Sequence, residues 1–171
     1  MDNVLQSFIL LTITIVIGLI LVAYFGGAFG IQSVNTVSEK EASCLAAGLQ
    51  IKENYVVQYG MDNIIVVPYE TQSYNEPIYI VAFPITSASQ LEFVTPNGIF
   101  CPINYSTPAI KANIEIYSTS NQIIYSGQIC MYKTYFNTPQ FLSVKTGESV
   151  MVWILACIDG KYYRIGYSEV S

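Results

Sequence analysis

The chain has 171 residues, enough for one long helix and one soluble domain of ordinary size. Charged residues make up only 11% of it, where about a quarter is usual, and the net charge is −5 with the basic residues scattered singly. This pattern argues against a nucleic-acid-binding surface, and the absence of histidine excludes catalytic triads of the Ser-His-Asp kind.

The first thirty residues predict one long hydrophobic helix, because no charged residue lies between Asp2 and Glu39. Residues 8–30 form an apolar run of about 23 residues, which at roughly 1.5 Å of rise per residue can span a bilayer. Thr12 and Thr14 can hydrogen-bond to carbonyls of the preceding turn. A helix that is apolar on all sides must be buried in lipid or among other helices.

The flank before this helix carries no basic residue, since the first Lys or Arg is Lys40. The stretch is therefore not an intact conventional signal peptide, and it lacks the Lys or Arg cluster that orients an ordinary signal anchor. We expect that a basic segment has been removed or that insertion is directed differently.

Gly26, Gly27 and Gly30 interrupt the apolar run, either as a close-contact surface between helices or as a bend. Residues 36–54 are amphipathic and predict a continued helix. Ser38, with Glu41 three residues later, also fits a capping box, so a break followed by a fresh helix start is an alternative.

Beyond residue 54, short runs of β-branched and aromatic residues recur between turn residues, which is typical of an all-β sandwich. Asn97-Gly98 and Asp159-Gly160 predict tight hairpin turns, and a further turn is expected at residues 60–63. The predicted strands are 55–59, 64–69, 78–84, 91–95, 99–103, 109–117, 122–136, 141–144, 149–158 and 161–167.

The sequence patterns of two of these strands predict which of their faces are buried. Residues 109–117 alternate, with Ile110, Ala112, Ile114 and Ile116 expected to face a core. Residues 149–158 are apolar on both faces and should be central in a two-layered structure, with Trp153 as a core anchor. The fold class is therefore α+β: a hydrophobic helix with its amphipathic continuation (residues 1–53), then an immunoglobulin-like sandwich domain (residues 54–171).

The four cysteines, Cys44, Cys101, Cys130 and Cys157, lie beyond the apolar helix without CxxC spacing. We expect two disulfides in an oxidising exterior, with buried thiols as the alternative; three pairings are possible. Asn104-Tyr105-Ser106 is a glycosylation sequon if the domain is exported, which makes Asn104 a candidate glycan acceptor.

No arrangement of residues indicates an enzyme, a cofactor or a metal site. Carboxylates are spread along the chain, and phosphate-binding, dinucleotide-binding and calcium-loop motifs do not occur. The fourteen tyrosines could form an adhesion surface, but strand packing explains most of them.

The segment Gln6 to Gly30, QSFILLTITIVIGLILVAYFGGAFG, followed directly by an all-β domain, resembles a processed archaeal type IV pilin. Leu5 stands where bacterial pilins carry a glutamate, which favours the archaeal branch. The resemblance covers about 30 residues closely and the rest in architecture only. No basic leader precedes Met1, so either the N-terminus is already processed or the resemblance fails at its defining step.

The resemblance implies a subunit of an extracellular type IV pilus on the cell surface, with a role in surface adhesion. Its precursor would be membrane-inserted, cut by a prepilin peptidase, and assembled with itself by an assembly ATPase and a platform protein. The alternatives are an archaellum-type filament subunit and a monomeric, membrane-anchored binding protein with an extracellular β-domain. The residues expected to form the polymerisation core are Phe8, Leu11, Ile15, Leu19, Val22, Phe25 and Phe29.

Overall fold

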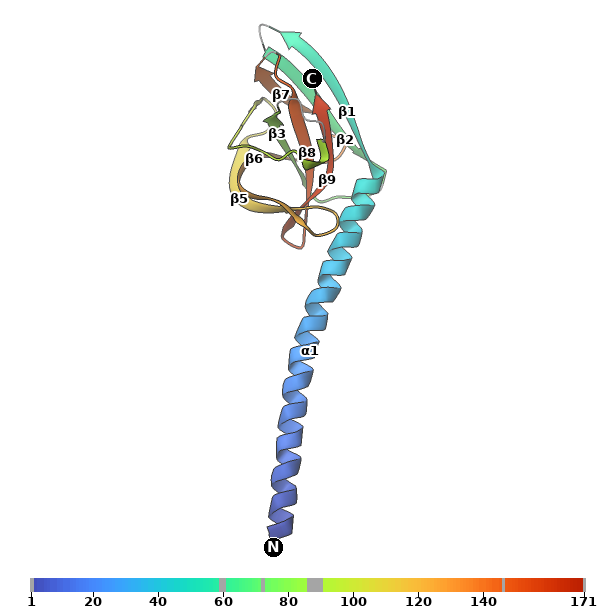
Figure 1. The fold of residues 1–171 in the computed structure, drawn as a ribbon. Coiled ribbons are helices and arrows are strands. Elements are labelled where there is room, and N and C mark those ends of the chain that lie inside the picture. The colour runs from blue at the N-terminus through green and yellow to red at the C-terminus, as the bar shows by residue number, and fades with distance from the viewer. Residues whose placement is uncertain (1, 59–60, 72, 86–90, 146, 171) are drawn as a thin grey trace. The chain divides into compact units, whose positions relative to one another are not determined.

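The computed structural model describes residues 2–58, 61–71, 73–85, 91–145 and 147–170; the side chains of residues 2–5, 25, 27–33 and 58 are not among those described. One long helix is followed by β-strands, so the α+β class is confirmed (Figure 1). The elements are α1 (Asp2–Gly48), β1 (Leu49–Gln58), β2 (Met61–Glu70), β3 (Ile78–Pro84), the 3-10 helix η1 (Leu91–Phe93), β4 (Ile103–Asn104), β5 (Ala109–Tyr117), β6 (Ile123–Thr134), β7 (Gln140–Lys145), β8 (Val150–Ile158) and β9 (Lys161–Val170).

The helix α1 is continuous, which confirms a continued helix and shows that a fresh start at Ser38 is wrong. The hydroxyl of Ser38 instead donates to Asp159 Oδ2 at 2.6 Å. The helix ends at Gly48, so the predicted helix over residues 49–54 was also wrong. Leu49 and Ile51 suit a strand equally well, because both lie on the inward face of β1 and pack against the core.

The chain divides into two compact units, residues 1–37 and residues 38–171. The division lies inside α1, so its last turns belong to the β unit, whereas the sequence had grouped residues 1–53. Ala42 and Leu45 explain this membership, because both side chains are buried in the core of the β unit.

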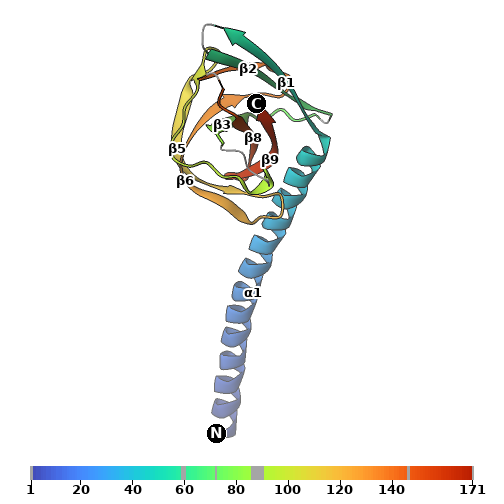
Figure 2. The ribbon, with the colours of Figure 1, turned by 45° about the horizontal axis from the view of Figure 1, so that its top comes forward.

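The strands form a four-stranded sheet, in the order β1-β2-β7-β4, and a closed barrel, β3-β6-β5-β9-β8. Figure 2 shows β5 and β6 wrapping around β3, β8 and β9. β5 and β9 close the barrel through a short parallel pairing, whereas the other strand pairs are antiparallel. The immunoglobulin-like sandwich predicted from the sequence is not confirmed by this topology.

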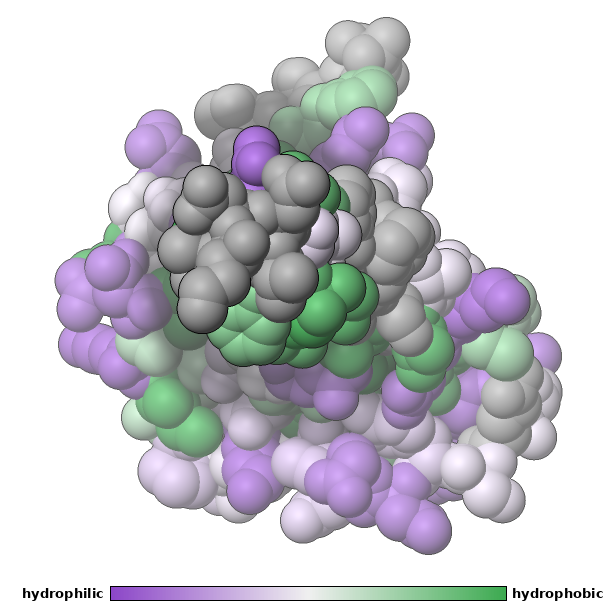
Figure 3. All heavy atoms as spheres, turned by 90° about the horizontal axis from the view of Figure 1, so that it is seen from below, coloured by the Kyte–Doolittle hydropathy of each residue, from purple (hydrophilic) through white to green (hydrophobic). Residues whose placement is uncertain are grey.

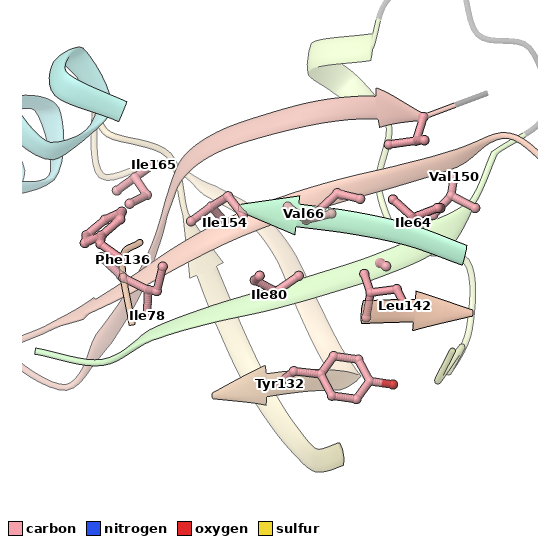
Figure 4. Packing of buried hydrophobic residues seen from close by; sticks show 14 of the residues in the cluster. Ile64, Val66, Ile78, Ile80, Tyr132, Phe136, Leu142, Val150, Ile154 and Ile165 are labelled. Carbon is pink, nitrogen blue, oxygen red and sulfur yellow. The ribbon is translucent and has the colours of Figure 1, made fainter. Parts of the chain in front are cut away.

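Strand β8 separates two hydrophobic clusters. Val152 and Ile154 face the four-stranded sheet, where Ile64 and Val66 of β2 meet them (Figure 4). The alternate residues Met151, Trp153 and Leu155 face the barrel interior. The prediction that this strand is central, with Trp153 as a core anchor, is confirmed: Trp153 is fully buried and packs edge-on against Phe83 at 5.2 Å between ring centroids.

Most predicted strands occur with shifted ends, and the hairpin between β8 and β9 has positive φ at both turn residues, Asp159 and Gly160. Ile116 is buried on β5, but Ile110 is exposed and Ala112 and Ile114 are half-buried, so the alternating face is only partly covered. The long strand predicted over 122–136 is β6.

Two local predictions were wrong. No hairpin flanks Asn97-Gly98, since residues 91–93 form η1 and residues 94–102 are irregular. Gly98 does have the positive φ expected of it, at 85°. The hairpin expected around residues 60–63 is present, because β1 and β2 pair antiparallel as far as Gln58 and Met61, but its turn was placed wrongly: residues 61–63 belong to β2, and Gly60 lies outside the described residues.

The four-stranded sheet also contacts the barrel where β1 meets β9. Leu49 packs so closely on Gly166 that a Cβ there would clash with Leu49 Cδ2, while Ile51 Cδ1 would lie at 3.5 Å. A glycine at this position therefore lets a large side chain of one sheet reach the backbone of the other.

Candidate functional site: an exposed apolar helix

The N-terminal unit presents large apolar side chains in every direction. Of the predicted polymerisation residues, Phe8 is 67% exposed, Leu11 58%, Ile15 54%, Leu19 65% and Val22 71%. The intervening positions Leu10, Ile13, Ile17 and Ile20 are also at least half exposed. Figure 3 shows hydrophobic atoms, in green, at the surface of this helix.

The polar groups of this segment are satisfied within the helix. Thr12 Oγ1 donates to the carbonyl of Phe8 at 2.9 Å, and Thr14 Oγ1 donates to the carbonyl of Leu10 at 2.8 Å, as the sequence predicted. Each hydroxyl therefore has a partner without water. The segment can enter an apolar environment without an unsatisfied hydroxyl at these two positions.

The helix is long and apolar enough to cross a membrane over Gln6–Tyr24, 19 residues with a mean hydropathy of 2.6. By length and composition it could be a membrane anchor or a signal sequence. Burying each large side chain would contribute roughly 1.5–3 kcal/mol relative to water. Such a surface needs lipid or other apolar helices around it.

The last part of the predicted polymerisation core is only partly described. The side chains of Phe25 and Phe29 lie outside the described residues, as do the surroundings of Gly27 and Gly30. The backbone is helical through all four positions, so a sharp break at the glycines is not present. A Cβ at Gly26 would meet nothing within 4 Å, so this glycine is open to a partner.

The cysteines divide into two pairs. Among the described residues, one disulfide is formed, between Cys101 and Cys130, with Cα atoms 5.5 Å apart. The second predicted disulfide is not formed: Cys44 is an exposed thiol on α1 and Cys157 a half-buried one on β8. Burial raises the pKa of the Cys157 thiol, and a backbone hydrogen bond at Gly160 opposes this.

The candidate glycan acceptor Asn104 lies in the short edge strand β4. Its Oδ1 accepts from the amides of Ser106 and Thr107, at 2.7 and 3.0 Å, and its Nδ2 donates to Gln140 Oε1 at 3.1 Å. A glycosylated Nδ2 keeps one hydrogen, so this bond can coexist with a glycan. Glycosylation at Asn104 stays a prediction.

Several titratable groups of the β unit have shifted pKa values, and two of them, Tyr74 and Tyr162, both interact electrostatically with Cys157 and Tyr79. Burial raises the pKa of Tyr74 to about 12, helped by the negative charges of Glu41 and Glu76. Burial also raises the pKa of Glu53, against a smaller opposing effect of a hydrogen bond from Ser168. These residues lie on different elements and do not form an acid–base pair.

The described residues hold no group of three or more His, Cys, Asp or Glu side chains that could bind a metal ion. Two surface hollows of the β unit contain one carboxylate each and no basic residue. The first, of about 630 Å³, is lined by Pro84, Ile85, Val94, Thr95, Asn97, Gly147, Glu148 and Ser149, and the second, of about 470 Å³, by Glu70, Thr71, Ser73, Tyr74, Asn75, Tyr135, Phe136 and Asn137.

One interacting group was not anticipated from the sequence. Arg164, the single arginine of the chain, places its guanidinium 5.0 Å from the ring centroids of both Trp153 and Tyr167. In a regular strand Arg164 and Tyr167 would lie on opposite faces, because they are three residues apart. The bulge opposite Ile154 and Leu155 places them on one face, so the contact could be predicted only by knowing that bulge.

Comparison of the chain with family models, with curated proteins and with solved structures finds no match.

Proposed function

We propose that this chain is the structural subunit of an extracellular filament of the type IV pilus kind, polymerising through α1. The observation that carries the proposal is the exposed and predominantly apolar surface of Gln6–Tyr24. Such a helix is stable in lipid before assembly and in a bundle of identical helices afterwards. The same surface would make the release of a single subunit into water unfavourable.

Two further features support the proposal. α1 is one continuous helix that runs from the apolar segment into the β unit without a loop. The Cys101–Cys130 disulfide fits an oxidising exterior. An immunoglobulin-like head, a prepilin peptidase, an assembly ATPase, a platform protein and an adhesive role also belong to this proposal.

The principal alternative is a monomeric β-domain that α1 tethers to a membrane. Both readings need an apolar helix, but only the filament needs contacts between helices of different copies. An archaellum-type filament subunit is the second alternative. Electron micrographs of sheared surface material from expressing cells separate filament from tether, since only filaments appear as long fibres.

The direct test introduces a charge into the proposed core. We expect Ile15→Asp and Leu19→Asp each to abolish filaments, because an unpaired buried charge costs several kcal/mol and recurs in every subunit. Asn113→Asp, which adds the same charge at an exposed position of β5, is the control and should assemble normally. The membrane fraction is assayed in parallel, so that failed insertion is recognised.

Normal fibre yield from both core variants would refute the filament proposal. A wild-type chain that is found in membranes but never in fibres would favour the tethered monomer.

A further inference from the structure

The closed barrel has a long stretch without strand pairing. β5 and β9 pair only at Ile116 with Tyr162 and Tyr117 with Tyr163. In the described part of the chain, residues 109–115 of β5 pair with β6 alone, and residues 164–170 of β9 pair with β8 alone. The barrel interior beside these edges needs another cover.

The segment of residues 91–102, here called the strap, supplies apolar side chains to this interior. Leu91 and Val94 pack against the cluster that contains Trp153, and Phe100 packs against both clusters. Pro96 is buried as well. Apart from the single turn η1, the strap has no regular structure, so packing and a few specific bonds hold it.

Three bonds fix the strap to the strands. Arg164 Nη1 donates to the carbonyl of Glu92 at 2.9 Å, while its guanidinium lies over Trp153. At the other end, the hydroxyl of Tyr132 donates to the carbonyl of Pro102. The disulfide from Cys101 to Cys130 on β6 is the one covalent tie among these bonds.

We propose that the strap is a cover over the Trp153 side of the barrel, latched by the Cys101–Cys130 disulfide, and that reduction of this bond lets it open while the strands stay folded. The inference is independent of the filament proposal, because it concerns the β unit alone. A dithiol supplies the two electrons and two protons that convert the bond into two thiols, and it becomes a cyclic disulfide itself.

Opening without unfolding follows from where the buried area lies. The fully buried side chains of both clusters belong mainly to strands, which are joined by continuous pairing of β3, β8 and β9. Leu91, Val94 and Phe100 are only partly buried, and the buried residues of the strap are Pro96 and Pro102. Segments with few buried contacts open locally at lower free energy than the whole unit.

Trp153 is the single tryptophan and is fully buried, so its fluorescence reports on the cover. The test uses the full chain in detergent, before and after addition of the dithiol. We expect a red-shifted emission and at least a threefold rise in quenching by acrylamide, with the far-ultraviolet circular dichroism unchanged. Backbone amides of residues 91–102 should exchange hydrogen roughly tenfold faster or more, and re-oxidation should reverse both effects.

Two variants test which cysteines are responsible for the response to the dithiol. Cys44→Ser with Cys157→Ser keeps the latch and should respond to the dithiol like the wild type. Cys101→Ala with Cys130→Ala lacks the latch and should show the open fluorescence without any reductant.

Three results would overturn the inference. The first is unchanged Trp153 quenching and amide exchange after verified reduction, which would show that packing alone holds the strap. The second is loss of the circular dichroism signal of the β-strands, which would show that the disulfide stabilises the entire β unit rather than the strap. The third is loss of the response in the Cys44→Ser, Cys157→Ser variant.

Discussion

Tyr132 is a buried tyrosine whose environment should make the stability of the chain sensitive to alkaline pH. Burial raises the pKa of Tyr132 from 10.0 to about 12. Between these two values the unfolded chain loses a proton that the folded chain keeps, so the free energy of unfolding falls as pH rises through this window. The contribution of Tyr132 is fully present below pH 10.

Tyr132→Phe tests this expectation. At neutral pH the variant should be less stable by about 1 kcal/mol, because the carbonyl of Pro102 loses its donor. The deficit should shrink as pH rises from 10 toward 12, since phenylalanine cannot ionise. Denaturant unfolding at several pH values measures this, with Tyr135→Phe at an exposed tyrosine as the control. A deficit that stays constant over the window would contradict the expectation.

At the scale of single residues, the sequence correctly predicted roles that depend on partners close by in the chain. Thr12 and Thr14 bond within their own helix, and Asp159-Gly160 forms its turn, because the partners lie within four residues. Ser38 was assigned to a local cap but bonds to Asp159 across the fold. Nothing in the spacing of these two residues indicates that contact.

At the scale of elements, Gly166 on β9 tests the contact between the two sheets. Gly166→Ala should cost on the order of 1–3 kcal/mol of unfolding free energy, because the new Cβ occupies the space of the Leu49 side chain. Adding Leu49→Val should recover part of this loss, giving a favourable coupling in a double-mutant cycle. Gly26→Ala, where the Cβ meets nothing, should be neutral or slightly stabilising. Purely additive effects at positions 49 and 166 would contradict the assigned contact.

The prediction of helices and strands succeeded where the sequence fits only one kind of element, and it failed where the sequence fits two. The apolar run of β8 and the turn before β9 leave little choice, so both were predicted. Leu49 and Ile51 fit the inward face of a helix or of a strand, and Gly48 with pairing to β2 decides for the strand. Residues 91–103 carry a hairpin signal at Asn97-Gly98, but the disulfide at Cys101 and packing on the barrel override it.

At the scale of the whole chain, the lack of histidine limits how assembly can respond to pH. The chain contains no side chain whose ordinary pKa lies between about 5 and 8. Glu53, whose pKa burial raises, is the described carboxyl with a resolved upward shift. For the proposed filament, we therefore expect the yield and helical parameters to be unchanged across this range, as measured by sedimentation and electron microscopy. A Glu53→Gln variant should behave identically, and a steep pH dependence in both chains would contradict the expectation.

The position of β8 between two clusters has a consequence for the order in which the chain folds during synthesis. β8 contributes to both clusters and pairs with β3 and β9, yet among the nine strands of the described residues it is the eighth to leave the ribosome. The β1–β2 hairpin can form early, but Ile64 and Val66 have no β8 surface to pack on until residues 150–158 emerge. The apolar segment of α1 is translated long before that point. For the proposed filament subunit, capture of this segment by a membrane would therefore precede completion of either core, and the β unit would fold while already tethered.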